Sequence, residues 1–238
     1  MNMTQQLSII IPTFNENQNI DSLIVKIMQL RPQPFIIVVD DNSPDGTAQI
    51  VEKNLKRFPK LFLIKRNQKA GRGSAVLAGL KLAMQNMNVT HLIEMDADFS
   101  HDPRELPHIL RTCVKADFVV ASRYVDKSQI INWPLPRRIF SKLANIFARS
   151  ILLVPVHDYT NGYRCYSRSA LELIDLNRLE EIGYALLMEM LYRAKQEKLN
   201  IVEVPTVFVN RRRGKSNTTF KEILNALNAP LRIRIRHK

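Results

Sequence analysis

A regular alternation of apolar runs with segments of helical period constrains the fold of this chain more than any other feature. The apolar runs, which predict strands, lie at 7–11, 35–39, 61–65, 91–96 and 117–122. The segments of helical period lie between them, at 18–30, 46–57, 73–86 and 104–115. Strands that alternate with helices are joined by right-handed crossovers and pair in parallel. We therefore expect an α/β fold with a mostly parallel central sheet flanked by helices.

The alternation ends after residue 123. An amphipathic, basic helix is predicted at 136–153, followed by a turn and strand within 158–167, a helix at 184–197 and a strand at 201–209. The apolar side of the helix at 136–153 carries Ile139, Phe140, Leu143, Ile146, Phe147 and Ile151. Such a helix either covers the protein's own core or lies on a membrane surface.

Composition indicates one compact domain of 238 residues with a basic end. The chain carries a formal charge of +13, and residues 211–238 hold nine Lys or Arg side chains against one acid, Glu222. We expect one compact domain, large enough for an enzyme, over 1–217 and a basic C-terminal helix or tail over 218–238. The basic end could bind nucleic acid, an anionic membrane or a phosphate-bearing substrate, or it could be a solvated tail. Nucleic acid is the weakest of these, because stacking on bases needs interleaved aromatic residues and only Phe220 is present.

The apolar patches are short and the cysteines are few. The patch at 151–156 falls well below the roughly 18 residues that span a bilayer, and the N-terminus does not resemble a secretory signal. Cys113 and Cys165 have no zinc-binding spacing, which favours reduced thiols. We expect a cytoplasmic protein that is soluble or peripheral on the cytoplasmic face of a membrane.

Polar segments follow the predicted strands at the edge where parallel sheets bind ligands. They lie at 12–16, 40–47, 65–75, 96–101 and 122–124. In the first two, Glu16 could reach a ligand and Asp41 could accept hydrogen bonds from a base or ribose, whereas Asp45 suits a helix cap. The segment at 65–75 matches neither a dinucleotide nor an ATPase phosphate-loop motif. Histidines 91, 101, 108 and 157 have no metal-site spacing, so ordinary hydrogen-bonding roles are expected.

Asp96 and Asp98 end the fourth apolar run. In an extended segment residues i and i+2 face the same side, and Ala97 leaves the space between the carboxylates open. Two carboxylates so close together are costly unless a cation lies beside them. Mg²⁺ and Mn²⁺ prefer oxygen ligands and bind through one or two carboxylates plus substrate phosphates. The pair therefore predicts a divalent-metal site for a phosphate-bearing ligand.

Six stretches, taken together and in this order, resemble the family 2 glycosyltransferases, and within them the dolichol-phosphate (polyprenol-monophosphate) mannose synthases. They read PTFNENQNI, VVDDNSPDGT, MDADFSH, ASRYV, DYTNGYRCY and VPTVFVNRRRGKSN and span about residues 7 to 217. The resemblance implies a nucleotide-sugar-transferase fold of the GT-A, Rossmann-like type. It also implies transfer of mannose, with inversion, from GDP-mannose to a dolichyl or polyprenyl monophosphate, with Mg²⁺ or Mn²⁺ as cofactor.

On the donor side, the resemblance implies a nucleoside pocket and a diphosphate site. The pocket would be lined by Pro12, Phe14, Glu16, Val39 and Asp41. Asp96, Ala97 and Asp98 would hold the diphosphate and its metal, with Asp98 the direct ligand, Ser100 a further metal position and Arg211 a contact to the diphosphate. Phe14 replaces a frequent tyrosine, and Ser100 stands where some relatives have glutamine.

On the acceptor side, Arg123, Arg137 and Ser141 would receive the lipid phosphate, and Arg123 would also face the donor. A frequent lysine is replaced by Asn217, so Lys215 or Lys221 would supply its charge. Because the second pKa of a phosphate monoester lies near 6, the attacking group needs no protein base. The basic helix at 136–153 and the basic end suit peripheral membrane contact, alone or through a small anchor subunit. A donor such as UDP-glucose, or an undecaprenyl phosphate or hydroxyl acceptor, is the alternative.

Overall fold

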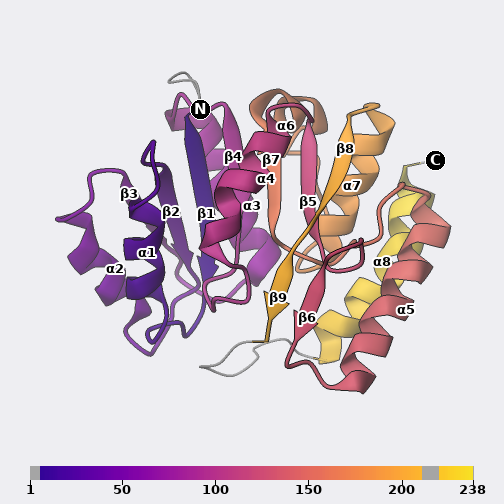
Figure 1. Cartoon of the computed structure of the whole chain (residues 1–238), viewed down its shortest axis with the longest axis horizontal. Helices are drawn as coiled ribbons and strands as arrows, with labels where there is room; N and C mark the ends of the chain where they lie inside the picture. Colours follow the sequence, from indigo (N-terminus) through magenta and orange to yellow (C-terminus); the bar gives the residue numbers. More distant parts are fainter. Residues whose placement is uncertain (1–5, 211–219, 238) are drawn as a thin grey trace.

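The computed structural model describes residues 6–210 and 220–237 and contains a seven-stranded sheet (Figure 1). Its order is β3-β2-β1-β4-β7-β5-β8. The strands are β1 (Leu7–Thr13), β2 (Phe35–Asp40), β3 (Leu61–Lys65), β4 (His91–Glu94), β5 (Phe118–Ser122), β7 (Arg164–Ser167) and β8 (Ile201–Pro205). All neighbours pair in parallel except β7, which is antiparallel to β4 and β5. The predicted α/β fold with a mostly parallel sheet is confirmed.

Helices cover both faces of the sheet. The helices packed on one face are α1 (Ile20–Met28), α2 (Thr47–Leu55) and, after a 3₁₀ turn (Pro103–Glu105), α4 (Leu106–Cys113). The other face carries α3 (Arg72–Asn86), α6 (Arg168–Ile174) and α7 (Ala185–Gln196). Side chains of a strand point alternately to the two faces, so Ile9 and Ile11 pack into one core and Ile10 into the other.

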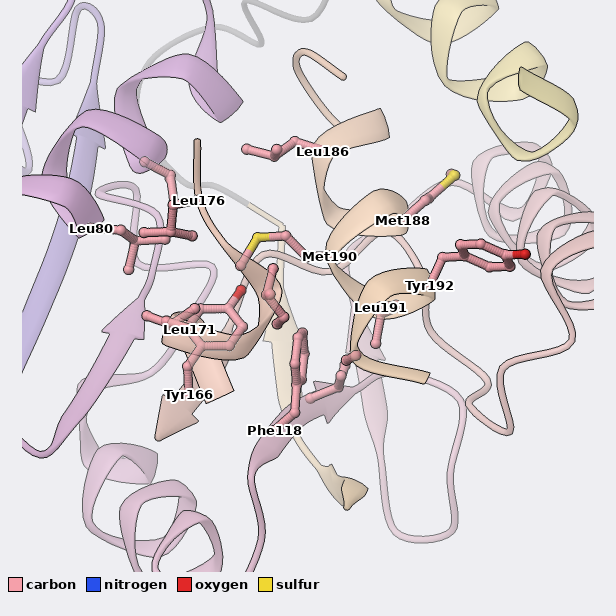
Figure 2. Close-up of a cluster of buried hydrophobic side chains, with 14 of the residues drawn as sticks. Leu80, Phe118, Tyr166, Leu171, Leu176, Leu186, Met188, Met190, Leu191 and Tyr192 are labelled. Carbon is pink, nitrogen blue, oxygen red and sulfur yellow. The ribbon is translucent and has the colours of Figure 1, made fainter. Parts of the chain in front are cut away.

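The core on the α7 face continues beyond the central sheet. Figure 2 shows Phe118 and Tyr166 from the sheet packed near Leu171 of α6 and Met190 of α7. The rings of Phe118 and Tyr166 meet edge to face, with centroids 4.6 Å apart. Ile233 belongs to the same core, although it lies near the end of the chain. This core therefore ties the C-terminal part of the chain to the central sheet and to α7.

The segment at 201–209, predicted as one strand, is two strands. β8 ends at Pro205, and β9 (Val207–Val209) pairs in parallel with β6 (Gln129–Ile131) in a separate two-stranded sheet. Between them, Thr206 Oγ1 donates to Glu105 Oε2 at 2.6 Å, and the Val207 amide donates to Glu105 Oε1 at 2.9 Å. Glu105 thus takes hydrogen bonds at the point where the chain leaves the first sheet.

Two long helices, α5 (Leu135–Leu152) and α8 (Phe220–Arg236), lie side by side at one end of the molecule (Figure 1). Only Asn145, Ala148 and Leu152 of α5 are buried. The interpretation that the apolar side of this helix covers the protein's own core is therefore wrong for most of it. The large apolar side chains of α5 that remain exposed are Leu135, Ile139, Phe140, Leu143, Ile146 and Phe147.

The basic C-terminal end is folded back on the protein. Arg232 Nη2 lies 2.6 Å from Glu181 Oε2, and Arg236 Nε lies 3.4 Å from Glu180 Oε2. Ile233 is fully buried, whereas Ile235 is 73% exposed. Over 220–237, the solvated-tail interpretation is therefore wrong. The boundary expected at residue 217 lies outside the described residues.

Within 6–210 and 220–237, none of the helices combines the length and the apolar character that crossing a membrane requires.

Candidate functional site

Two cavities meet beyond the carboxyl ends of the parallel strands, and both are lined by Asp96, Asp98 and Tyr184. The smaller cavity, of about 120 Å³, lies where β1, β2 and β4 end. The larger cavity, of about 360 Å³, extends from Arg123, after β5, to the groove between α5 and α8. The aspartate pair singled out from the sequence therefore lies at the junction of two binding spaces.

Four of the five residues expected to form a nucleoside pocket line the smaller cavity: Pro12, Phe14, Glu16 and Asp41. Lys69 Nζ lies 4.2 Å from the centre of the Phe14 ring and adds a cation beside it. The fifth residue, Val39, does not line either cavity. Its side chain is fully buried, and its Cγ2 lies 3.2 Å from the position that a Cβ on Gly79 would take.

Asp41 is buried and already bound by several donors. Its Oδ2 accepts from the amides of Ala70 and Gly71 at 3.1 and 2.9 Å, and Arg66 forms an ion pair with it. These contacts fix the loop before α3 against the end of β2. The preceding residue, Asp40, accepts hydrogen bonds from Thr13 and Ser43 and has a structural role.

The loop after β4 turns tightly around Asp98. Its Oδ1 accepts from the amide of Ser100 at 3.0 Å and from Ser100 Oγ at 2.6 Å, and Phe99 between them has a φ of 60°. Ala97 and Ser100 are almost fully buried, whereas the side chain of Asp96 is 29% exposed. Both carboxylates thus reach the cavity junction, but a turn brings them there and not the extended segment from which their shared direction was predicted.

The donor set at the junction fits a hard divalent cation. Both Asp96 and Asp98 offer carboxylate oxygens, the ligand type that Mg²⁺ and Mn²⁺ prefer. Within the described residues, no cluster of three or more His, Cys, Asp or Glu side chains suits a metal. Mg²⁺ commonly binds through one or two carboxylates together with water and substrate phosphates, which fits a pair of this size.

Arg72, at the start of α3, is a site residue that sequence reasoning missed. Its Nε donates to Asp96 Oδ1 at 2.7 Å, its Nη1 to Glu94 Oε2 at 2.8 Å and its Nη2 to the carbonyl of Gly162 at 2.9 Å. Burial alone would lower the pKa of Arg72, but the Asp96 and Glu94 carboxylates outweigh burial and raise that pKa. The guanidinium therefore stays charged and fixes the first aspartate of the pair.

The position of Arg72 depends on a glycine. A Cβ on Gly162 would lie 1.9 Å from Arg72 Nη2, which is far inside van der Waals contact. Glu94, at the far side of Arg72, is fully buried and also accepts a hydrogen bond from the Tyr166 hydroxyl. The only sequence signal for this arrangement was that residue 72 follows a strand end.

Arg123, on the other side of the junction, is paired with Asp158. Its Nε and Nη2 donate to the two carboxylate oxygens at 2.8 Å each, and Nη2 also donates to Thr160 Oγ1 at 2.7 Å. Burial would lower the pKa of Arg123, but the Asp158 carboxylate outweighs it and raises that pKa. The sequence predicted the arginine but not its partner, which lies 35 positions away.

Aromatic rings and two further predicted residues surround Arg123. Its guanidinium lies 5.3 Å from the Trp133 ring centre, and the Arg137 guanidinium lies 4.2 Å from the same ring. Ser141 Oγ accepts from the Tyr124 hydroxyl at 2.7 Å. Arg123, Arg137 and Ser141 all line the larger cavity, so the structure brings together the three residues expected to face an acceptor.

The larger cavity changes character along its length. Its end at the junction is polar, and its wall between α5 and α8 is apolar. This wall includes Phe140, Ala144, Phe147, Ile223, Ala226, Leu227 and Pro230. The arrangement can hold a molecule with an anionic head and a hydrocarbon chain.

Several predicted positions lie outside the described residues. One is Arg211, expected at the donor diphosphate. The others are Asn217, which stands in place of a frequent lysine, and Lys215, one of two residues expected to supply the missing charge. Lys221 is the second residue of α8, but its side chain is not described.

Solved structures confirm the fold. Glucosyl-3-phosphoglycerate synthase from Mycobacterium tuberculosis, in complex with Mn²⁺, UDP and glucosyl-3-phosphoglycerate, matches with a TM-score of 0.68 at 18% identity. The match covers 98% of this chain and 79% of that chain. The same enzyme with Mn²⁺, UDP and phosphoglyceric acid matches with a TM-score of 0.70 at 18% identity, over 98% and 78% of the two chains. The expected GT-A fold is thus confirmed.

Sequence relatives are closer. The chain is 38% identical to polyprenol monophosphomannose synthase of Mycolicibacterium smegmatis, over 94% of this chain and 85% of that protein. It is 36% identical to undecaprenyl-phosphate mannosyltransferase of Micrococcus luteus, over 87% and 85% of the two. The family model described as glycosyl transferase family 2 matches residues 8–174, which include the aspartate pair and the Arg123–Asp158 pair. The chain belongs to glycosyl transferase family 2.

Proposed function

We propose that the chain transfers a mannosyl group from GDP-mannose to the phosphate of a polyprenyl or dolichyl monophosphate. The larger cavity carries this proposal, because a cationic end and an apolar wall suit a lipid phosphate and not a free sugar. The names of the two sequence relatives support mannose as the sugar and a polyprenyl phosphate as the acceptor. GDP as the nucleotide rests on the resemblance seen in the sequence.

The smaller cavity would take the donor. Pro12, Phe14, Glu16 and Asp41 would surround the nucleoside, and the diphosphate would point toward the cavity junction. Asp98, with Asp96, would hold a Mg²⁺ or Mn²⁺ ion that neutralises charge on the departing diphosphate. The structural neighbours with Mn²⁺ and with Mg²⁺ support a divalent ion.

The acceptor phosphate would bind at the polar end of the larger cavity. Arg123 and Arg137 would receive it, because guanidinium groups bind phosphate oxygens in pairs and stay charged. Ser141 would add a hydrogen bond. The phosphate dianion then attacks the sugar carbon that bears the diphosphate, so that one C–O bond forms as the other breaks and the configuration inverts. The arginines reduce the repulsion between two anions that must come close together.

The outer face of α5 would lie on an anionic membrane, on its cytoplasmic side. Exposed Ile139, Leu143 and Ile146 would enter the interface, and exposed Arg138 and Lys142 would meet acidic lipids. Each basic side chain near such a surface contributes about 1 kcal/mol. This placement would let a polyprenyl chain pass from the bilayer into the groove between α5 and α8.

The test is an assay of sugar transfer into the lipid phase. GDP-mannose and UDP-glucose, each labelled in the sugar, are offered with polyprenyl phosphate or with the corresponding polyprenol, with and without EDTA. We expect label from GDP-mannose only, in polyprenyl phosphate only, and only with divalent metal. Transfer from UDP-glucose alone would replace the donor, and transfer to polyprenol would contradict phosphate as the nucleophile.

A further inference from the structure

His101 lies fully buried between the two halves of the site, and each of its ring nitrogens binds one of them. Nδ1 accepts from the backbone amide of Asp96 at 3.0 Å, and Nε2 lies 2.9 Å from Asn161 Oδ1. Because a backbone amide can only donate, Nδ1 carries no proton. Nε2 therefore carries it and donates to Asn161.

The ring has little freedom to leave this position. It stacks on Tyr163 with centroids 4.8 Å apart and planes 14° apart, and the edge of Phe208 contacts it with centroids 5.7 Å apart. A rotation of the imidazole would leave the Asp96 amide without this acceptor. The histidine thus fixes the backbone from which the aspartate pair projects.

Asn161 continues the connection to the acceptor side. The side-chain Nδ2 of Asn161 donates to the carbonyl of Ala121 at 2.5 Å, and its backbone amide donates to Asp158 Oδ1 at 3.0 Å. Asp158 is the carboxylate that holds Arg123 through both oxygens. A continuous set of buried hydrogen bonds therefore runs from the Asp96 backbone through His101 and Asn161 to the carboxylate that orients Arg123.

We propose that His101 and Asn161 are positioning residues that hold the donor-side carboxylates and the acceptor-side arginine in register. This inference rests on the proposed function, because it concerns the alignment of the two substrates. A displacement of about 1 Å between reacting groups can lower a rate about 100-fold. A rigid bond network across the junction would keep two mutually repelling anions aligned for attack.

Replacing His101 by asparagine or by glutamine should remove one hydrogen bond of the ring and keep the other. In His101→Asn, an oxygen near the δ position can still accept from the Asp96 amide, but the side chain is too short to reach Asn161. In His101→Gln, an amide nitrogen near the ε position can still donate to Asn161, and the Asp96 amide loses its acceptor. We expect His101→Asn to raise the KM for polyprenyl phosphate about tenfold with little change in the donor KM. We expect His101→Gln to raise the donor KM about tenfold with little change in the KM for polyprenyl phosphate.

Binding of GDP with Mg²⁺, measured by calorimetry, gives a readout that is independent of turnover. The Kd for GDP should match wild type in His101→Asn and rise about tenfold in His101→Gln. The exposed His108 of α4 provides matched controls, His108→Asn and His108→Gln, which should change neither KM nor Kd. Equal effects of the two His101 variants on both substrates, or no effect on either, would overturn the positioning role.

Asn161→Ser tests the same connection from its other end. It should raise the acceptor KM at least as much as His101→Asn does, since it also removes the bond to Ala121. The double variant should be no worse than Asn161→Ser alone, because that variant already lacks the link to His101. Additive losses would contradict the connection, and this comparison does not depend on the fate of His101→Gln. If wild-type protein made no mannosyl phospholipid, the proposed function would fail instead. Wild-type turnover with identical kinetics for both His101 variants would refute only the positioning role.

Discussion

At the scale of single residues, the buried ion pairs around the aspartate pair decide both stability and reactivity. Arg72 neutralises Glu94, which is fully buried, and orients Asp96. Removing the arginine would leave the buried Glu94 carboxylate without its ion-pair partner, so Arg72→Leu should destabilise the fold by about 3–5 kcal/mol. Chemical denaturation measures this change.

The double variant Arg72→Leu with Glu94→Gln should recover much of that loss, because it removes the unpaired charge. The fully exposed Arg104, paired with Asp102, provides the control: Arg104→Leu should leave the denaturation midpoint nearly unchanged. If the double variant were no more stable than Arg72→Leu alone, the buried charge would not be the cause.

Asp98 is the residue on which donor chemistry depends most directly in the proposed mechanism. Asp98→Ala should lower kcat at least about 100-fold, since it removes a carboxylate that would hold the metal at the leaving diphosphate. The protein should remain folded, but its melting temperature should fall modestly, because the Ser100 amide and hydroxyl lose their acceptor. The exposed Asp126→Ala is the control. Wild-type kinetics in Asp98→Ala would remove this residue from the site.

The pH dependence of kcat/KM should follow ionisation of the acceptor phosphate and not of a protein group. Burial would raise the pKa of Asp158, but Arg123 outweighs it and holds that pKa below its ordinary value of 3.8. Asp158 therefore stays ionised, and its contribution to stability persists until the pH falls below about 4. The acceptor phosphate loses its second charge near pH 6, so kcat/KM should fall about tenfold per unit below that pH.

A phosphonate analogue of the acceptor has a higher second pKa than the phosphate. It therefore shows whether the acid limb of the pH profile comes from the acceptor or from a protein group. Its acid limb should shift upward by the difference between the two second pKa values. An unchanged limb would mean that a protein group titrates instead.

At the scale of elements, α5 has its apolar side chains on the outside. Replacing Ile139, Leu143 and Ile146 together by serine should weaken binding to anionic phospholipid vesicles at least tenfold, because the apolar area available to the interface is lost. Co-sedimentation with vesicles measures the binding. Added salt should weaken the wild-type interaction, since basic side chains contribute to it.

Leu173→Ser on α6 is the matched control, because Leu173 is also exposed but belongs to a different helix. It should leave vesicle binding unchanged. Equal losses from both surfaces would mean that the contact is not specific to α5.

The main elements could be predicted, since apolar runs and helical spacing are local properties. The antiparallel sense of β7 could not, because it depends on its pairing with β4 and β5. The break at Thr206 depends on Glu105, about a hundred positions earlier in the chain. For α5 the sequence left both directions open, because periodicity defines an apolar face but not what that face points to.

At the scale of the whole molecule, α8 is part of the core on the α7 face, and its basic character conceals this. Ile233→Ala should destabilise the protein by about 2–4 kcal/mol, since it leaves a cavity in that core. Ile235→Ala, two positions away and 73% exposed, should change stability by no more than about 0.5 kcal/mol. Equal denaturation midpoints for the two variants would mean that α8 is not integrated.

The candidate site was predictable where its residues follow strand ends, as Asp41, Asp96 and Arg123 do. Its supporting residues were not, because Arg72, Asp158 and other partners acquire their roles only through tertiary contacts. Val39 was expected in the nucleoside pocket but lines neither cavity, for the same reason. Its position at the end of a strand is visible in the sequence, but its burial against Gly79 is not.

The close approach of Arg72 to Gly162 has an evolutionary consequence. The two positions lie 90 apart in the chain, yet a side chain larger than hydrogen at the second would displace the Arg72 guanidinium from its bonds to Asp96, Glu94 and the carbonyl of residue 162. Homologues that carry a bulkier residue at the second position should therefore have an arginine that points elsewhere, or a different residue at the first.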